Sequence, residues 1–278
     1  MALHKSTKIR QVLQKWNSFV CHSNQWTCRN TLYRQSCLFS TTTWKLDKAE
    51  SKPSGINPLA HKDFFDVRQL YSIKSLFDAG VHLGHKTGVW NPLMKRYIYG
   101  DRHGNHIIDL NETDRHLFLA LNVTSHIAYR KGVILFVCCR PQFQHLVQRT
   151  ARECQEFFVI QRWRGGILTN AHKLLPVPRL PDLIIFLSVP YNMDAIRESA
   201  QANIPSIGIV DTDCNPNLIT YPIAGNDDSL SSLELYCRLF STAILNAKVQ
   251  RQNDDNYTID KSNDGETPRD NSRAEMAS

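Results

Sequence analysis

Long apolar runs are missing from this sequence of 278 residues. The longest stretches, VILFVCC at 133–139 and LIIFL at 183–187, fall far short of the roughly 18–20 residues that a membrane-spanning helix requires. The N-terminal region also lacks the apolar segment of a secretory signal peptide. The sequence therefore predicts a protein that neither crosses a membrane nor is secreted.

Motifs for cofactor and nucleophile chemistry are missing as well. The sequence contains no GxGxxG and no GxxxxGK[ST] loop, so the phosphates of a nucleotide lack their usual cradle of backbone N–H groups. It also contains no GxSxG turn to expose a nucleophilic serine. The sequence thus predicts no cofactor and no catalytic residues.

Cysteine is present, but paired cysteine motifs are not. Three of the eight cysteines lie before position 47, and the remaining five, an odd number, form no CxxC pair. This usage indicates free thiols in a reducing compartment rather than a disulfide framework. For Cys138 and Cys237 we expect burial in the core.

Acidic residues are absent before Asp47, although the chain as a whole carries a formal charge of +7. Residues 1–50 hold eight Lys or Arg, and residues 1–46 hold eleven Ser or Thr with bases spaced among apolar residues. This composition is typical of an organellar transit peptide, whose cationic amphipathic helix responds to import receptors and the membrane potential. The alternative is a disordered basic arm that binds RNA.

The remaining chain divides into a linker, an α/β domain and a tail. Residues 47–63 mix charge, Pro, Gly and Ser, and are expected to be a linker. Between 64 and 248, continuous apolar strands alternate with amphipathic helices, which predicts a parallel sheet with helices on both faces. Residues 249–278 are polar and acidic, and are expected to be disordered.

Within the domain, several element boundaries can be predicted. The pattern indicates helices over 64–79, 111–132 and 229–248, and a β-hairpin over 96–110 around a glycine-containing turn. The predicted strands are 133–139, 157–160, 182–189 and 206–211.

Two basic segments are candidates for RNA contact. After the strand at 157–160, Arg162 and Arg164 flank Trp163, and guanidinium groups beside an aromatic plane suit RNA phosphates and unstacked bases. Burial of Trp163 in the core is the favoured alternative for that side chain, with at least one flanking arginine facing outward. A second cluster contains Lys86, Trp90, Lys95, Arg96, Arg102 and Arg115, and its alternative is an ordinary solvated edge.

Two further groups resemble ligand sites. Four carboxylates that follow predicted strands could hold Mg²⁺ in an enzyme that binds a phosphorylated compound, but turns and helix caps explain them better; they are Asp211, Asp213, Asp227 and Asp228. Two HxxH pairs, His82 with His85 and His103 with His106, would make a zinc-dependent RNA-binding module. They lack Cys or Glu partners at dependable spacing, so no metal is expected.

Longer motifs carry a resemblance to a known family. The segments 79–110 (AGVHLGHKTGVWNPLMKRYIYGDRHGNHIIDL), 157–170 (FFVIQRWRGGILTN), 180–187 (LPDLIIFL) and 203–229 (NIPSIGIVDTDCNPNLITYPIAGNDDS) resemble the bacterial-type small-subunit ribosomal protein two, and most closely its mitochondrial form. The match extends in order over about 70–248.

The resemblance implies a flavodoxin-like (Rossmann-like) α/β fold without catalytic activity. It implies binding to small-subunit ribosomal RNA and to neighbouring proteins of the mitochondrial ribosome. The candidate contacts lie in the loop from His82 to Arg96, at the turn near Arg102, and in the loop from Arg162 to Asn170.

One departure from the family is expected at the connection after Asn170. Bacterial members insert a long helical hairpin there, whereas only AHKLLPVPR (171–179) joins Asn170 to Leu180. Nine residues with two prolines are too few for such a hairpin. Its contacts must be missing or supplied by another subunit.

The leader gives a first testable prediction. Residues 1–50 fused to a fluorescent reporter should carry the reporter into mitochondria, because this segment has the charge pattern of a transit peptide. Confocal co-localisation with a matrix marker measures the result. The matched control replaces the bases of the leader by glutamine and should leave the reporter in the cytosol, while a cytosolic reporter with the unchanged leader would contradict the prediction.

Overall fold

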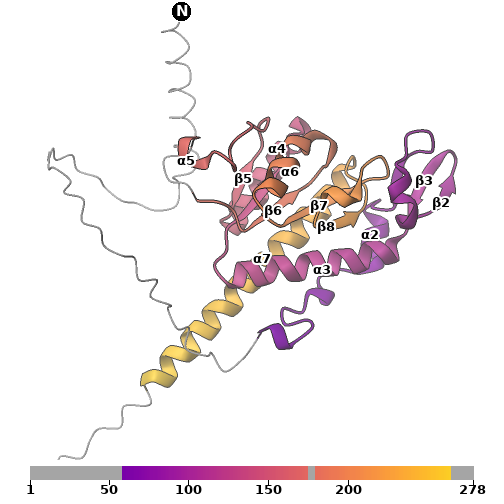
Figure 1. The fold of residues 1–278 in the computed structure, drawn as a ribbon. Helices are drawn as coiled ribbons and strands as arrows, with labels where there is room; N and C mark the ends of the chain where they lie inside the picture. Colours follow the sequence, from indigo (N-terminus) through magenta and orange to yellow (C-terminus); the bar gives the residue numbers. More distant parts are fainter. Residues whose placement is uncertain (1–57, 175–178, 264–278) are drawn as a thin grey trace, which may run out of the picture. The chain divides into compact units, whose positions relative to one another are not determined.

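The computed structural model describes residues 58–174 and 179–263. These residues form two sheets, one parallel with five strands and one antiparallel with three strands, surrounded by helices (Figure 1). The presumed leader and most of the linker lie outside the described residues. None of the described helices is both long enough and apolar enough to span a membrane.

The parallel sheet is the centre of the fold. Its strand order is β5-β4-β6-β7-β8, with bounds β4 (Ile134–Val137), β5 (Phe157–Val159), β6 (Leu183–Phe186), β7 (Ser206–Val210) and β8 (Tyr221–Ala224). Every residue of β4, β6 and β7 is buried. Their uninterrupted apolar sequences follow from this burial, because both faces of the sheet are covered.

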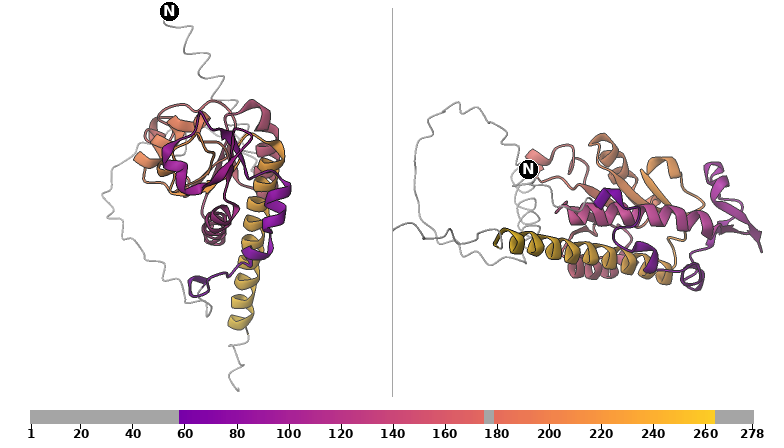
Figure 2. Two further views of the ribbon diagram at one scale, coloured as in Figure 1. Left: turned by 90° about the vertical axis from the view of Figure 1, so that its right-hand side faces the viewer. Right: turned by 90° about the horizontal axis from the view of Figure 1, so that it is seen from below.

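Three helices cover one face of the sheet. They are α3 (Leu110–Tyr129), α4 (Gln144–Cys154) and α7 (Leu230–Asn263). Alternate strand residues such as Phe136, Ile185 and Ile207 pack against them in one core cluster, which also buries Cys138 and Cys237 as expected. The helices α3 and α7 pack against each other and cross at an angle, as the left view of Figure 2 shows.

Among the described residues, the one helix of more than a single turn that packs on the opposite face is α6 (Met193–Gln201). Two non-helical segments complete its cover. Trp163 and Leu168 come from the loop after β5, while Met94 and Tyr97 come from the 3₁₀ helix η3 (Pro92–Tyr97). The predicted α/β sheet with helices on both faces is therefore confirmed, and two of its covering segments are the candidate RNA-binding loops.

The antiparallel sheet contains the predicted hairpin, formed by β2 (Ile98–Arg102) and β3 (Asn105–Ile108). A further strand, β1 (Leu83–Lys86), pairs with the other edge of β3, so the order is β1-β3-β2. The register shifts by one residue within β1 and again within β2, which places a bulge in each strand.

Two predicted helices differ from the structure. The helix expected over 64–79 is a 3₁₀ turn, η2 (Val67–Gln69), followed by a separate short helix, α2 (Ile73–Asp78). The break arises because Ser72 and Ser75 form a capping box that starts α2 afresh. The last helix does not end at Lys248 but continues to Asn263, so the expectation of disorder from position 249 is wrong for 249–263.

Polar contacts with the end of α3 account for the longer helix. The Arg251 guanidinium donates to the Ala128 carbonyl at 3.1 Å, and the Tyr129 hydroxyl donates to Asp254 at 2.7 Å. Lys131 lies 3.7 Å from Asp255. These tertiary contacts stabilise helical turns whose sequence has no apolar stripe.

The fold makes a steric prediction at Gly225, directly after β8. A Cβ atom there would collide with the hydroxyl of the buried Tyr236. Gly225→Ala should therefore lower the free energy of unfolding by roughly 1–3 kcal/mol, the usual cost of overpacking a rigid core. Urea denaturation of the full chain measures it.

A second substitution checks the cause of that loss. In the Gly225→Ala background, Tyr236→Phe removes the colliding hydroxyl and should restore part of the lost stability. If the double variant is no more stable than Gly225→Ala alone, the collision with Tyr236 is not the cause.

Candidate nucleic-acid interface

The carboxyl ends of the parallel strands, where α/β proteins usually bind ligands, are occupied by side chains of this chain. Arg140 follows β4 and lies nearly buried, with its guanidinium 4.5 Å from the centre of the Tyr191 ring. One guanidinium nitrogen lies 3.6 Å from an Asp227 carboxylate oxygen, and the other pairs with Asp228. Arg140 also donates to the Asp227 carbonyl at 2.9 Å. The arginine thus ties the end of β4 to the segment after β8.

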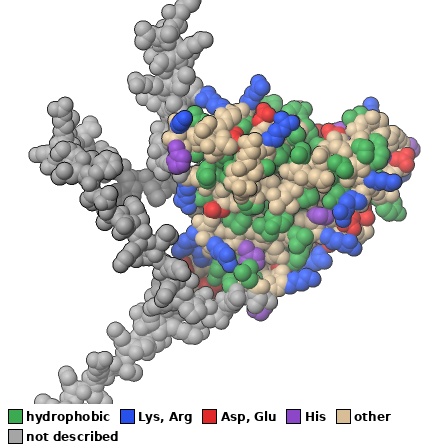
Figure 3. All heavy atoms as spheres, in the orientation of Figure 1, with side chains coloured by type: hydrophobic (Ala, Val, Ile, Leu, Met, Phe, Trp, Pro, Cys, Tyr) green, Lys and Arg blue, Asp and Glu red, His purple; other side chains and the backbone are tan. Residues whose placement is uncertain are grey.

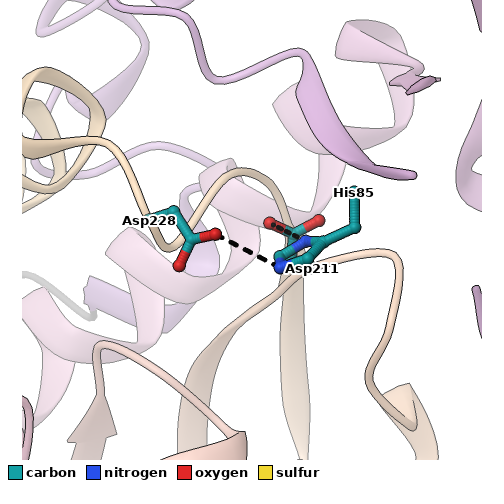
Figure 4. A group of neighbouring side chains, drawn as sticks. All are labelled: His85, Asp211 and Asp228. Atoms are coloured by element: carbon teal, nitrogen blue, oxygen red, sulfur yellow. Dashed lines mark ion pairs between the residues drawn. The ribbon is translucent and has the colours of Figure 1, made fainter. Parts of the chain in front are cut away.

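A histidine joins the antiparallel sheet to the same edge. His85 comes from β1, and its Nδ1 lies 3.1 Å from Asp211 while its Nε2 lies 3.2 Å from Asp228 (Figure 4). The His85 backbone N–H donates to the Thr212 hydroxyl at 2.9 Å. The hydrogen bond to Asp211 and the nearby carboxylates raise the pKa of His85 to about 9, despite the opposing effect of burial. At neutral pH His85 is therefore an imidazolium that bridges two carboxylates.

The group His85, Asp211 and Asp228 is also the only set of three or more potential metal ligands found among the described residues. Their ligand atoms lie within 4.8 Å of one another. Both imidazole nitrogens, however, face carboxylate oxygens, and this is the geometry of a doubly protonated ring. A metal ligand must offer a free nitrogen lone pair. The arrangement therefore fits a set of ion pairs better than a metal site. We call His85 with its two partners, Asp211 and Asp228, the His85 latch.

The four carboxylates of the possible Mg²⁺ site serve the chain itself. Asp211 and Asp228 hold His85, and Asp213 accepts from the Cys214 thiol. Asp227 is fully buried beside Arg140, and burial raises its pKa to about 6 against the lowering effect of that arginine.

Asn226 closes a turn directly before α7, because its side chain accepts from the N–H groups of Asp228 and Ser229, which precede the first helical residue, Leu230. The predicted turn is thus present, with an asparagine as its acceptor.

The structure does not bring the two HxxH pairs into one group of ligands within the described residues. The His82 ring stacks on Phe77, with ring centres 4.3 Å apart, and His106 packs edge-on against Trp90 at 5.5 Å. His103 lies exposed in the hairpin turn. The zinc-dependent module is therefore not supported.

The loop after β5 is organised by one buried carboxylate. Glu198 of α6 accepts hydrogen bonds from the Trp163 indole at 2.7 Å and from the backbone N–H groups of Leu168 at 2.8 Å and Thr169 at 3.0 Å. Burial alone would raise the pKa of Glu198, but these donors outweigh it and lower the pKa below its usual value.

This arrangement fixes which loop residues face outward. Trp163 is buried, with 7% of its surface exposed, while Arg162, Arg164 and Asn170 are exposed. The expectation of a buried tryptophan between outward arginines is confirmed. Position 198 was not found from the sequence, because a glutamate 35 residues after the tryptophan on a helix has no motif that marks it.

The antiparallel sheet gathers the second set of candidates. Lys86 and Arg102 are the register partners of Asn105 on its two sides, so the three side chains form one row across the sheet. All three are exposed. Paired positions of an antiparallel sheet share a face. The row therefore presents the Asn105 amide with one positive charge on each side, from Lys86 and from Arg102.

The other candidates of this set differ in their exposure. Lys95 and Arg96 are exposed on η3, with the Arg96 guanidinium 5.3 Å from the centre of the Tyr97 ring. Trp90 is only half-exposed because it packs on His106. Over the face shown in Figure 3, Lys and Arg side chains are spread in several places and do not form one continuous basic patch.

A family model described as Ribosomal protein S2 matches residues 76–177 and 173–247. The chain belongs to this family. It is 52% identical over 200 residues to the small ribosomal subunit protein uS2m of Bos taurus, which covers 70% of this chain and 68% of the bovine protein. It is 35% identical over 219 residues to the small ribosomal subunit protein uS2 of Rickettsia akari, covering 63% of this chain and 74% of that protein.

Family membership settles two expectations. The resemblance stated from the motifs is confirmed, and with it the flavodoxin-like fold. The S2 family consists of structural ribosomal proteins and not of enzymes, which decides against the alternative of a phosphate-ligand enzyme.

The comparison also bears on the short connection after Asn170. The two parts of the family match meet at 173–177, and the alignment of 219 positions to the Rickettsia protein covers only 63% of this chain. The bacterial relative therefore has tens of aligned positions without a counterpart here. In the connection after Asn170, the structure describes one short helix, α5 (Ala171–Leu174).

The His85 latch predicts a pH-dependent stability. The pKa of His85 is raised by folding, so its contribution is fully present below the unfolded pKa of about 6.5 and is lost as the pH rises through about 9. His85→Gln should lower the free energy of unfolding by on the order of 1–3 kcal/mol at pH 6, because the glutamine cannot carry charge.

Urea denaturation of both proteins at pH 6, 8 and 9.5 measures the difference. The gap between wild type and His85→Gln should shrink as the pH rises. A gap that is equal at all three values would show that packing, and not the charge of His85, accounts for the loss.

Proposed function

We propose that this S2-family chain binds small-subunit ribosomal RNA and neighbouring ribosomal proteins through two preformed basic segments. The chain is a structural protein of the small ribosomal subunit, and its 52% identity to the bovine uS2m protein implies location in the mitochondrial ribosome. The proposal adds which of its surfaces meet the RNA.

The observation that carries the proposal is the dual role of the two segments. The loop 161–170 and the segment 83–108 cover one face of the sheet with buried residues such as Trp163 and Tyr97. Their cationic residues point away from that core: Arg162, Arg164, Lys86, Lys95, Arg96 and Arg102 are all exposed. Because the core fixes the backbone of both segments, the charges are positioned before RNA binds and little ordering entropy is lost on binding.

Local charge matters more than total charge for this protein. Much of the formal +7 resides in the first 50 residues. The folded part therefore cannot rely on a general attraction to polyanions. Phosphate contacts at fixed arginine and lysine side chains, which also carry the salt dependence of RNA binding, are the mechanism that remains.

The proposal predicts the effect of removing two arginines. Arg162→Ala with Arg164→Ala should reduce the fraction of the protein that co-sediments with mitochondrial small subunits several-fold, because two phosphate contacts are lost. The melting temperature of the purified protein should stay the same, since both side chains are exposed. Sucrose-gradient sedimentation and thermal melting measure the two quantities.

Arg149→Ala is the matched control. Arg149 is 69% exposed and lies on α4, over the opposite face of the sheet. It should sediment like the wild type. If the double variant unfolds instead, the two arginines are structural, and if the wild-type protein is found mainly free in the matrix, the function itself is contradicted.

A further inference from the structure

The exposed aromatic residue Tyr99 on β2 is not used by the fold. It is 81% exposed, more than any other large hydrophobic side chain that the structure reports as exposed in its described part. Tyr97, two positions earlier, is 5% exposed and belongs to the core. Tyr97 is the last residue of η3, whereas Tyr99 lies inside β2, so the two rings belong to different elements and point to different surroundings.

Tyr99 also lies at the bulge in β2. Ile98 is the register partner of Ile108, whereas Gly100 is already the partner of Ile107. Tyr99 is therefore the extra residue of the bulge. A bulge of this kind turns one side chain out of the regular pattern and is common beside binding sites.

The residue after Tyr99 leaves the neighbouring backbone bare. A Cβ atom added at Gly100 would meet no atom within 4 Å, and the residue does not have a positive φ. The fold therefore has no steric need for glycine at this position. A glycine inside a strand weakens it, and often marks a place where a ligand approaches the backbone closely.

The charges near this platform indicate the chemistry of the ligand. The hairpin that carries Tyr99 ends in the row of Lys86, Asn105 and Arg102, and Lys95 and Arg96 directly precede β2. One exposed acid, Asp101, also lies on β2, but cations outnumber it on the hairpin and its flanks. An exposed flat ring on the same hairpin as these cations suits a ligand with flat rings on an anionic backbone. Single-stranded RNA has this structure, and stacking of a base on an aromatic side chain does not depend on its sequence.

We propose that Tyr99 and Gly100 form a stacking site for one unpaired base of the small-subunit ribosomal RNA, with Lys86 and Arg102 contacting phosphates of the same strand. The inference rests on the proposed RNA-binding function and adds to it the form of RNA that is bound. A duplex cannot satisfy such a site, because its bases are stacked on one another.

Photochemical cross-linking of assembled particles tests the stacking site. Mitochondrial small subunits that contain the full chain are irradiated at short ultraviolet wavelength, which joins a stacked base to the aromatic ring beneath it. Nuclease and trypsin digestion then releases the peptide from Tyr97 to Arg102, which follows Arg96. Fragment masses should place a nucleotide on Tyr99 and not on the buried Tyr97.

Variants separate stacking from folding. Tyr99→Phe keeps the ring and should retain the adduct on residue 99, whereas Tyr99→Ala should lose it. Gly100→Val should leave the melting temperature unchanged, because the space above Gly100 is open, and should reduce the adduct several-fold by covering the bare backbone.

Other results would overturn the inference in distinguishable ways. RNA adducts elsewhere on the chain with none on Tyr99, or a cross-link from Tyr99 to another protein, would refute the stacking site and leave the RNA-binding function standing. Absence of the chain from small subunits would refute the function together with the inference. If the Gly100→Val variant formed as much adduct as the wild type, Gly100 would not be part of the stacking site.

Discussion

The need to cover both faces of a parallel sheet governs this structure. One face receives three helices, but the other receives only α6, which is too short to shield five strands. The loop after β5 and the segment before β3 must complete that layer, and they do so with Trp163, Leu168, Met94 and Tyr97. The hydrophobic core itself holds the segments that carry the cationic surface. The backbone at their outward residues is therefore fixed by the packing against the sheet.

Contacts within the chain also organise the carboxyl edge of the sheet, where α/β proteins usually bind ligands. At the carboxyl edge, Arg140 and His85 share the carboxylates that follow β7 and β8. These ion pairs connect β4, β8 and the antiparallel sheet to one another. A ligand that displaced these side chains would break contacts that hold the two sheets together.

The parts of the fold that follow from local patterns were predictable, and the parts that depend on distant contacts were not. The strands β4 and β6 are wholly apolar, and β7 is apolar after Ser206, so these three can be predicted from the sequence. The strands β1 and β8 cannot, because LGHK and YPIA are short and show no period. The outward arginines around Trp163 could be predicted from the cost of burying a guanidinium. Glu198, Arg140 and the bulge at Tyr99 act through partners far along the chain or through register, which leave no local signal.

The direction of α7 has an electrostatic consequence. This helix begins after β8, at the carboxyl edge beside the basic segments, and its later turns contact the end of α3 beside the start of β4. At 1.5 Å per residue, the 24 positions from Leu230 to Asp254 extend roughly 36 Å, several times the Debye length of about 8 Å in physiological salt. The carboxylates Asp254 and Asp255 are therefore screened from the basic loops. The long helix therefore places Asp254 and Asp255 away from the segments proposed to contact RNA.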